Sequence, residues 1–191
     1  MRQRWPLLKP IAGLARPGAV LVAGLLMAAV VACVLVTHWP VLSAQATAFD
    51  DAEYLFNNPT LLKPGWASAK RVFREVLHSP QVDGYYEPLT LVSLMIDVAR
   101  GGTLEQLRPF HQVSLALHGL NTLLVIVLIQ RLFGNVYIAA GLGLLFGLHP
   151  MTVEPIAWVW ERKTVLATFF ALLSLIFYLA GVRRGTKWGW Q

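Results

Sequence analysis

Charge is scarce in this sequence. Only 14% of its 191 residues are charged, whereas a soluble domain carries about 25%. Hydrophobic residues make up 56% of the chain, and the mean hydropathy is +0.56. This composition argues against a soluble globular domain with a large core and predicts an integral membrane protein.

Cysteine is almost absent as well. The single Cys33 lies inside an apolar run, which excludes an intramolecular disulfide and the spacings of a zinc finger. No low-complexity tract and no helical-hairpin repeat of about 34 residues is found. The net charge is +6, but the basic residues are scattered or flank apolar runs. Membrane topology explains them better than nucleic acid, which we do not expect as a partner.

Four apolar runs are predicted to cross the membrane, at about residues 18–38, 110–132, 136–150 and 164–182. The basic residues of segment 1–17 place the N-terminus in the cytoplasm. Segment 43–109 then becomes a long outer loop, and segment 183–191 a cytoplasmic tail that we expect to be truncated. The predicted fold is an all-α membrane protein with about four transmembrane helices and interfacial helices in its first outer loop.

The first apolar run has a second interpretation, a cleaved signal peptide. Ala44-Gln45-Ala46 is typical of a small-residue cleavage site. However, the run exceeds the usual hydrophobic region of roughly 7–15 residues, and a long basic segment precedes it. We therefore favour a membrane span.

The outer loop contains two predicted helices that are too short to cross a bilayer. Residues 67–78 have apolar and basic faces, so this helix is expected in the headgroup plane, where anchorage is favoured over contact with a phosphate. Residues 89–99 are apolar and are expected to pack at the membrane surface, with Gly101-Gly102 ending the helix.

Asp50 and Asp51 are the first candidates for chemistry, because they follow the first span almost at once. Acids so close to hydrocarbon are costly and mark functional sites by default. The simpler interpretation is that Asp50 caps a helix beginning near Ala52, and these residues alone favour the cap.

The predicted topology places six further ionisable residues on the same outer side: Glu87, His149, Glu154, Glu161, Arg162 and Lys163. A carboxylate can take a proton from an attacking hydroxyl, and Arg or Lys can hold a phosphate leaving group. Each residue also has a structural explanation, such as an interfacial ion pair between Glu161 and Arg162 or a cap at His149.

His111 and His118 lie seven residues apart on one face of the second predicted span. Helix packing is favoured over metal binding, since no third ligand is evident. A second carboxylate beside the first is nevertheless suited to a divalent cation, so the metal requirement stays open.

Four motifs, in this order, resemble the transmembrane and tetratricopeptide-repeat O-mannosyltransferase family of the GT-C class. They are Phe49-Asp50-Asp51; Tyr86-Glu87-Pro88-Leu89-Thr90-Leu91-Val92-Ser93; Phe110-His111 with Leu117-His118-Gly119-Leu120-Asn121; and the segment from His149-Pro150-Met151 to Trp160-Glu161-Arg162-Lys163. The last motif is the most specific. The resemblance covers roughly residues 49–181.

This resemblance implies transfer of a sugar, with mannose favoured, from a polyprenyl-phosphate donor to a protein Ser or Thr hydroxyl on the outer face. It assigns the catalytic acid to Asp50 or Asp51. The donor side falls to His149, Glu154, Glu161, Arg162 and Lys163, with Arg162 expected at the phosphate and Glu87, His111 and His118 in support. The expected location is a bacterial-type inner membrane.

Two departures from the family stand out. The family usually has a basic residue where Glu87 stands, which puts donor-phosphate binding or the acceptor in doubt. The GT-C membrane module also has more than four spans, and the family adds C-terminal repeats, so this chain is expected to be the N-terminal part of a longer protein. The alternative is a non-catalytic membrane anchor or scaffold, or an inactive fragment. Transport is disfavoured because the predicted spans contain few ionisable groups.

Overall fold

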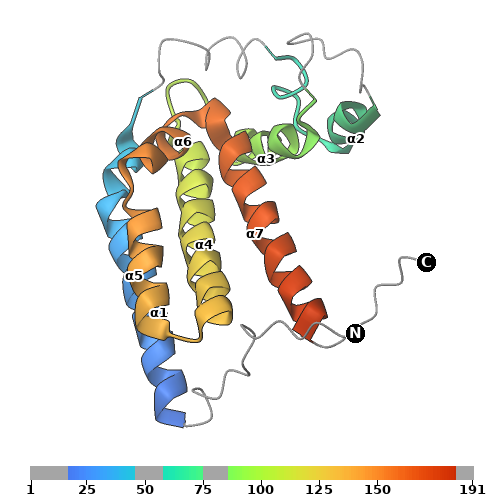
Figure 1. Cartoon of the computed structure of the whole chain (residues 1–191). Helices are drawn as coiled ribbons and strands as arrows, with labels where there is room; N and C mark the ends of the chain where they lie inside the picture. The colour runs from blue at the N-terminus through green and yellow to red at the C-terminus, as the bar shows by residue number, and fades with distance from the viewer. Residues whose placement is uncertain (1–16, 46–57, 75–85, 184–191) are drawn as a thin grey trace, which may run out of the picture. The chain divides into compact units, whose positions relative to one another are not determined.

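The computed structural model describes residues 17–45, 58–74 and 86–183. The order of its longer helices is α1 (Pro17–Thr37), α2 (Trp66–Arg74), α3 (Pro88–Ala99), α4 (Arg108–Phe133), α5 (Val136–Gly147) and α7 (Arg162–Arg183) (Figure 1). Short helical segments complete it: η2 (Trp39–Ser43), η4 (Pro150–Thr152), α6 (Val153–Ala157) and η5 (Val159–Glu161). No strand occurs in these three described ranges.

Within the described ranges, three helical segments are long and apolar enough to cross a membrane: Pro17–Ser43, Arg108–Phe133 and Val159–Arg183. A fourth candidate combines Val136–Gly147 with Pro150–Ala157, two helical stretches bent by 58° at a short break. The prediction of an all-α membrane protein is therefore confirmed, with three spans or, if the bent pair is one span, four.

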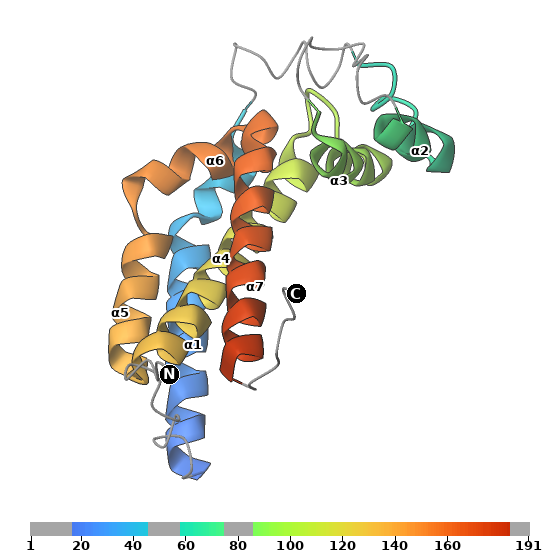
Figure 2. The same ribbon diagram turned by 45° about the vertical axis from the view of Figure 1, so that its right-hand side comes forward.

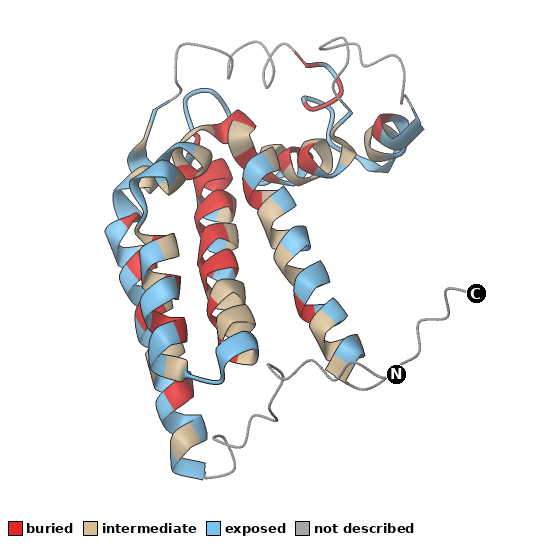
Figure 3. Ribbon diagram, viewed as in Figure 1, coloured by how far each residue is buried: buried red, intermediate tan, exposed pale blue. Residues whose placement is uncertain are grey.

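The chain divides into two compact units, and α4 and α7 each contribute to both. In described residues, the first unit comprises 17–36, 119–149 and 168–183, and the second 37–45, 58–74, 86–118 and 150–167. Figure 3 shows that buried residues are frequent along α4, whereas much of the surface of α1 and α7 is exposed. Exposed apolar side chains are expected on helices that face lipid.

Small residues hold the first unit together. Ala139 on α5 is fully buried and packs in one cluster with Ile126 of α4 and Val30 of α1. Gly143 and Gly147 lie so close to α4 and α1 that an added methyl group would overlap the side chains of Ile126 and of Val34, respectively. Small residues allow this close approach of helices, which is a usual way to pack them in a bilayer.

The break after α5 follows from local chemistry at both ends of the helix. Asn135 caps the start, because its side-chain oxygen accepts hydrogen bonds from the N–H groups of Tyr137 (3.0 Å) and Ile138 (3.2 Å). At the other end α5 stops at Gly147, and Pro150 cannot continue its hydrogen-bond pattern. The third predicted span, 136–150, is thus a shorter helix that is followed by a bend.

The second unit has a separate hydrophobic core, to which α2 and α3 both contribute. These two helices lie side by side (Figure 2). Its fully buried centre includes Leu61, Leu94 and Phe110. Val159 and Trp160 join this core from η5, so the segment that precedes α7 is packed against α3 and the beginning of α4.

A glycine pair ends α3, as the sequence predicts. Gly101 has φ +91°, a conformation that is favourable mainly for glycine. Gly102 lies directly against the ring of Phe110, and its N–H donates to the carbonyl of Asp97 (2.9 Å). This tight turn brings the end of α3 next to the start of α4.

Candidate functional site

A buried ion pair lies at the centre of the second unit. Nη2 of Arg162, the first residue of α7, is 2.8 Å from Oδ2 of Asp97 on α3. Both side chains are 0% exposed. Two charges are removed from water here, and such a pair is tolerated only when further polar contacts surround it.

The remaining donors of Arg162 supply those contacts. Nε donates to Oγ of Ser114 (3.0 Å), Nη1 to Oγ of Ser93 (2.8 Å), and Nη2 to the carbonyl oxygen of Phe110 (2.6 Å). The guanidinium therefore links the start of α7 to α3 and α4 at once. A planar group with several fixed donors suits this role better than a lysine.

The role of Arg162 in binding the donor phosphate stays a prediction, and of the two adjacent cations Lys163 is the one that solvent reaches. The side chain of Arg162 is completely buried, and its nitrogen donors point to groups of the protein. An external phosphate would have to displace Asp97 to reach it. In this geometry Arg162 fixes the start of α7 against α3 and α4, next to Lys163.

Lys163 is the neighbouring cation that solvent can reach, with 29% of its side chain exposed. Its Nζ atom is 3.3 Å from Oε1 of Glu161 and 4.0 Å from Oε1 of Glu87, and it lies 5.8 Å from the centre of the Trp160 ring. Glu161 is itself fixed by the Thr164 hydroxyl, which donates to its Oε2 (2.6 Å). Three of the residues predicted for the site thus lie together.

Glu87 occupies an unusual electrostatic position in this cluster. Its Oε2 is buried without a hydrogen-bond partner. Burial raises the pKa of the Glu87 carboxyl above its ordinary value of 4.5; nearby Lys163 opposes the rise and the charge of Glu161 adds to it. The Glu87 carboxyl therefore keeps its proton to a higher pH than an exposed glutamate, and its protonation would make the net charge of the cluster more positive.

The other predicted donor-side residues are exposed. Glu154 lies in the first turn of α6, in the second unit, and His149 follows α5, in the first unit. Asp50 and Asp51, the predicted catalytic acids, lie outside the described residues.

The two predicted supporting histidines of α4 are buried in the second unit. Nε2 of His111 lies 3.3 Å from the carbonyl oxygen of Ala44, which joins α4 to the end of η2. The ring of His118 packs edge-on against His38, with 5.4 Å between ring centres. Within the described ranges, no group of three or more His, Cys, Asp or Glu side chains could hold a metal ion.

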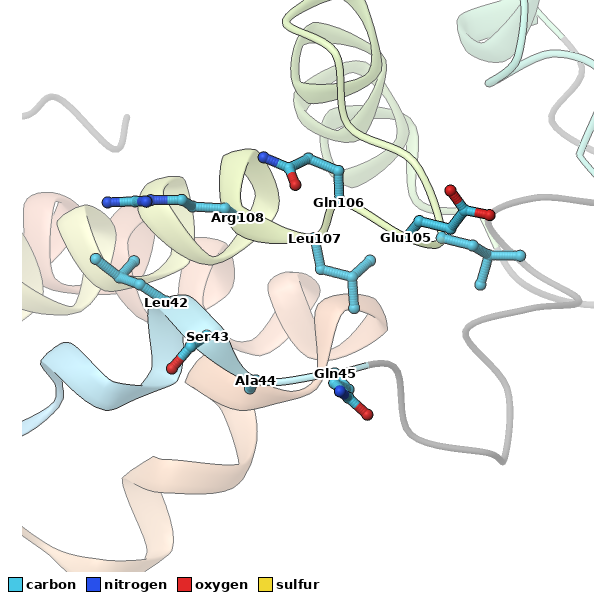
Figure 4. Close-up of a pocket in the computed structure, with 9 residues that line it drawn as sticks. Leu42, Ser43, Ala44, Gln45, Glu105, Gln106, Leu107 and Arg108 are labelled. Carbon is cyan, nitrogen blue, oxygen red and sulfur yellow. The ribbon is translucent and has the colours of Figure 1, made fainter.

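A polar pocket of about 510 Å³ opens beside the start of the predicted catalytic loop. Figure 4 shows residues 42–45 on one side and 105–108 on the other, with Leu107 pointing towards Ala44 and Gln45. Ser43, Gln45, Glu105, Gln106 and Arg108 supply its polar groups. It is lined by residues other than those of the Lys163 cluster, and it borders Gln45, after which the described chain is interrupted.

Asp97, Ser93 and Ser114 are the residues that sequence reasoning missed. Asp97 offered a signal, because it is the only ionisable residue in the apolar run 88–99, and an acid in such a run is normally paired or functional. Its partner could not be read from spacing, since Arg162 comes from a distant part of the chain. Ser93 ends the second motif of the resemblance but was given no role there, and Ser114 offered no signal.

Comparison with known proteins gives one consistent result. Over 111 residues, 55% of this chain and 13% of the relative, the sequence is 35% identical to human protein O-mannosyl-transferase TMTC2. It is 30% identical to mouse protein O-mannosyl-transferase TMTC1 over 144 residues, 71% of this chain and 15% of the relative. Human protein O-mannosyl-transferase TMTC4 is 28% identical over 164 residues, 74% of this chain and 21% of the relative.

The chain thus spans at most about a fifth of the length of these relatives, since the alignments cover 13% to 21% of them. No family model matches the sequence, and no solved structure matches it.

Proposed function

Because the matched part of this chain is related to the family of protein O-mannosyl-transferases, we propose that it is the N-terminal part of a membrane glycosyltransferase of the GT-C class. The proposed reaction transfers a sugar, with mannose favoured, from a polyprenyl-phosphate carrier to a Ser or Thr hydroxyl of a protein. The proposed site faces the outer side of a bacterial-type inner membrane, with the N-terminus in the cytoplasm.

The reaction exchanges one bond for another at the anomeric carbon of the sugar. The acceptor oxygen forms a bond to that carbon and loses its proton to a carboxylate, for which we propose Asp50 or Asp51. The bond between the carbon and the phosphate oxygen breaks, and the electron pair leaves with the polyprenyl phosphate. A cation near that oxygen favours departure because it stabilises the developing charge.

Lys163 is the proposed cation. It is partly exposed, unlike Arg162, and its ammonium group is placed by Glu161 and by the Trp160 ring. The adjacent Arg162 fixes the position of Lys163, because its ion pair with Asp97 joins the start of α7 to α3. Glu87 and Glu161 are proposed to set the net charge around Lys163. Outside this cluster, the exposed His149 and Glu154 are retained as proposed donor-side residues on sequence grounds.

The observation that carries the proposal is the way the segment Trp158–Lys163 is fixed. Val159 and Trp160 are packed in the core of the second unit, and the adjacent Arg162 makes four polar contacts within it. Within this firmly held segment, Lys163 and Glu161 stay accessible. A preorganised anion site requires such a fixed and accessible cation.

The test is a transfer assay on a longer form that contains this chain. It uses polyprenyl-phosphate mannose and a Ser/Thr-containing peptide in reconstituted membranes. Replacement of the catalytic carboxylate in Asp50→Asn or Asp51→Asn is expected to lower turnover by at least about 100-fold, the lower range for loss of a general base. Asp83→Asn, which removes another acid of the same predicted outer loop, should retain activity.

Full activity in both Asp50→Asn and Asp51→Asn would refute the proposed base. Insertion of the variants into the membrane, measured alongside, separates a loss of chemistry from a loss of folding.

A further inference from the structure

The described stretch 58–74 of the outer loop carries charge of one sign. It contains Lys63, Lys70, Arg71 and Arg74, and these seventeen described positions include no Asp or Glu. Because a helix advances about 100° per residue, Lys70, Arg71 and Arg74 share one arc of α2. Trp66, Ala69, Val72 and Phe73 share the adjacent arc, which makes α2 a short amphipathic helix.

The position of α2 is built into the second unit. The side-chain oxygen of Asn58 accepts from the N–H groups of Thr60 (3.0 Å) and Leu61 (3.2 Å), which forms the turn before the helix. Leu61 and Val72 then pack in the core beside α3. The basic arc is therefore held in one orientation relative to α3.

An apolar groove of about 330 Å³ lies between α2 and α3. Its walls include Trp66 and Ala69 from α2, and Val92, Met95, Ile96 and Ala99 from α3. Trp66 is 84% exposed and Ile96 is 56% exposed, so the rim of the groove is apolar as well as its floor. Lys70 follows Trp66 by one helical turn, which places a cation next to the groove.

We propose that this surface binds an anionic phospholipid, with the headgroup phosphate at the basic arc of α2 and an acyl chain along the groove between α2 and α3. Charge complementarity favours an anionic headgroup, since basic residues near such a surface each contribute to binding. A Trp at the rim is typical of the boundary between headgroups and hydrocarbon. The site is separate from the Lys163 cluster and does not depend on the proposed sugar transfer.

The size of the effect follows from the number of charges. One basic residue near an anionic membrane surface contributes about 1 kcal/mol, which corresponds to about 5-fold in affinity. Removal of two such charges in Lys70→Gln/Arg74→Gln should weaken the preference for anionic over zwitterionic lipid by about 30-fold.

The experiment measures this preference at the site itself. In a Cys33→Ser background, Gly65→Cys, which lines the groove and has open space for a side chain, carries a fluorophore, and the chain is placed in nanodiscs of phosphatidylcholine. A small fraction of either phosphatidylglycerol or phosphatidylcholine carries brominated acyl chains, which quench the fluorophore on contact. Brominated phosphatidylglycerol is expected to quench more strongly than brominated phosphatidylcholine at the same mole fraction.

Two variants separate the parts of the site. Lys70→Gln/Arg74→Gln, which leaves only Arg71 on the basic arc, should lose most of the difference between the two lipids. Arg2→Gln/Arg4→Gln, with the same change in net charge, should keep it. Ala99→Leu fills part of the groove and should reduce quenching by both lipids. Equal quenching by the two lipids in the unsubstituted chain, or an unchanged preference in Lys70→Gln/Arg74→Gln, would overturn the proposal.

Discussion

Replacing Asp97 by leucine is the change that tests the second unit most severely. The substitution leaves the guanidinium of Arg162 fully buried and without the carboxylate 2.8 Å away. Removal of one partner of a buried ion pair typically costs about 3–5 kcal/mol, because the other charge stays in a medium of low dielectric constant. We expect Asp97→Leu to lower the free energy of unfolding by this amount.

The double variant Asp97→Leu/Arg162→Met should be far less harmful than the single variant. Both charges are then absent, and apolar side chains of similar size fill their place. Ser93, Ser114 and the carbonyl of Phe110 each lose one hydrogen bond from the guanidinium. Because the removal of two buried charges offsets part of the loss of these three hydrogen bonds, the expected net loss is only about 1–2 kcal/mol.

Arg100→Gln is the matched control, because Arg100 also pairs with Asp97, at 3.8 Å, but its side chain is 51% exposed. Exposed pairs contribute about 0–1 kcal/mol. The measurement is unfolding of the complete chain in detergent micelles, titrated with denaturant and followed by circular dichroism. The Arg162→Met single variant completes the cycle. The prediction is wrong if Asp97→Leu costs no more than Arg100→Gln, or if the double variant costs as much as Asp97→Leu and Arg162→Met added together.

Three further predictions concern single residues. Gly102→Ala should destabilise the chain by about 1–3 kcal/mol, since the new methyl group would overlap the ring of Phe110, whereas Gly65→Ala, which meets open space, should cost much less in the same unfolding assay. The pKa of Glu87 is raised in the folded state, which therefore holds this proton more tightly than the unfolded state does. Stability should fall as pH rises from about 4.5 through the folded pKa. In a pH series of unfolding curves, Glu87→Gln should remove that fall. Asn135→Ala removes the cap of α5 and should cost about 1 kcal/mol, with Asn135→Ser recovering most of it; a loss of similar size in both variants would contradict the capping role.

Much of the helical architecture could be predicted, because apolar runs and their breakers are local signals. The apolar stretches that become α1, α4 and α7 stand out by length alone. Gly101 marks the end of α3 because its positive φ suits glycine. The bend after α5 was harder to predict. Pro150 indicates a break in the helix, but the direction of the following helix depends on tertiary packing, which the spacing of residues does not encode.

The candidate site was predictable only in part, because residue spacing does not encode tertiary packing. Glu87, Glu161 and Lys163 were all selected as ionisable groups beside apolar runs, and the structure places them together. Arg162 is buried and Lys163 is partly exposed because Arg162, and not its neighbour, faces Asp97. That choice is made by tertiary packing, so a motif that names both residues does not distinguish the buried cation from the accessible one.

The account depends most on one geometric claim, that the aspartate pair and the segment ending at Lys163 meet at the same side of the membrane. The direct measurement is labelling of single cysteines, Asp50→Cys or Glu154→Cys, in a Cys33→Ser background with a maleimide that cannot cross the membrane. We predict that both cysteines react in intact cells from the outer side. If either one reacts only after the membrane is permeabilised, the two regions lie on opposite sides and the proposed sugar transfer at a shared site is wrong.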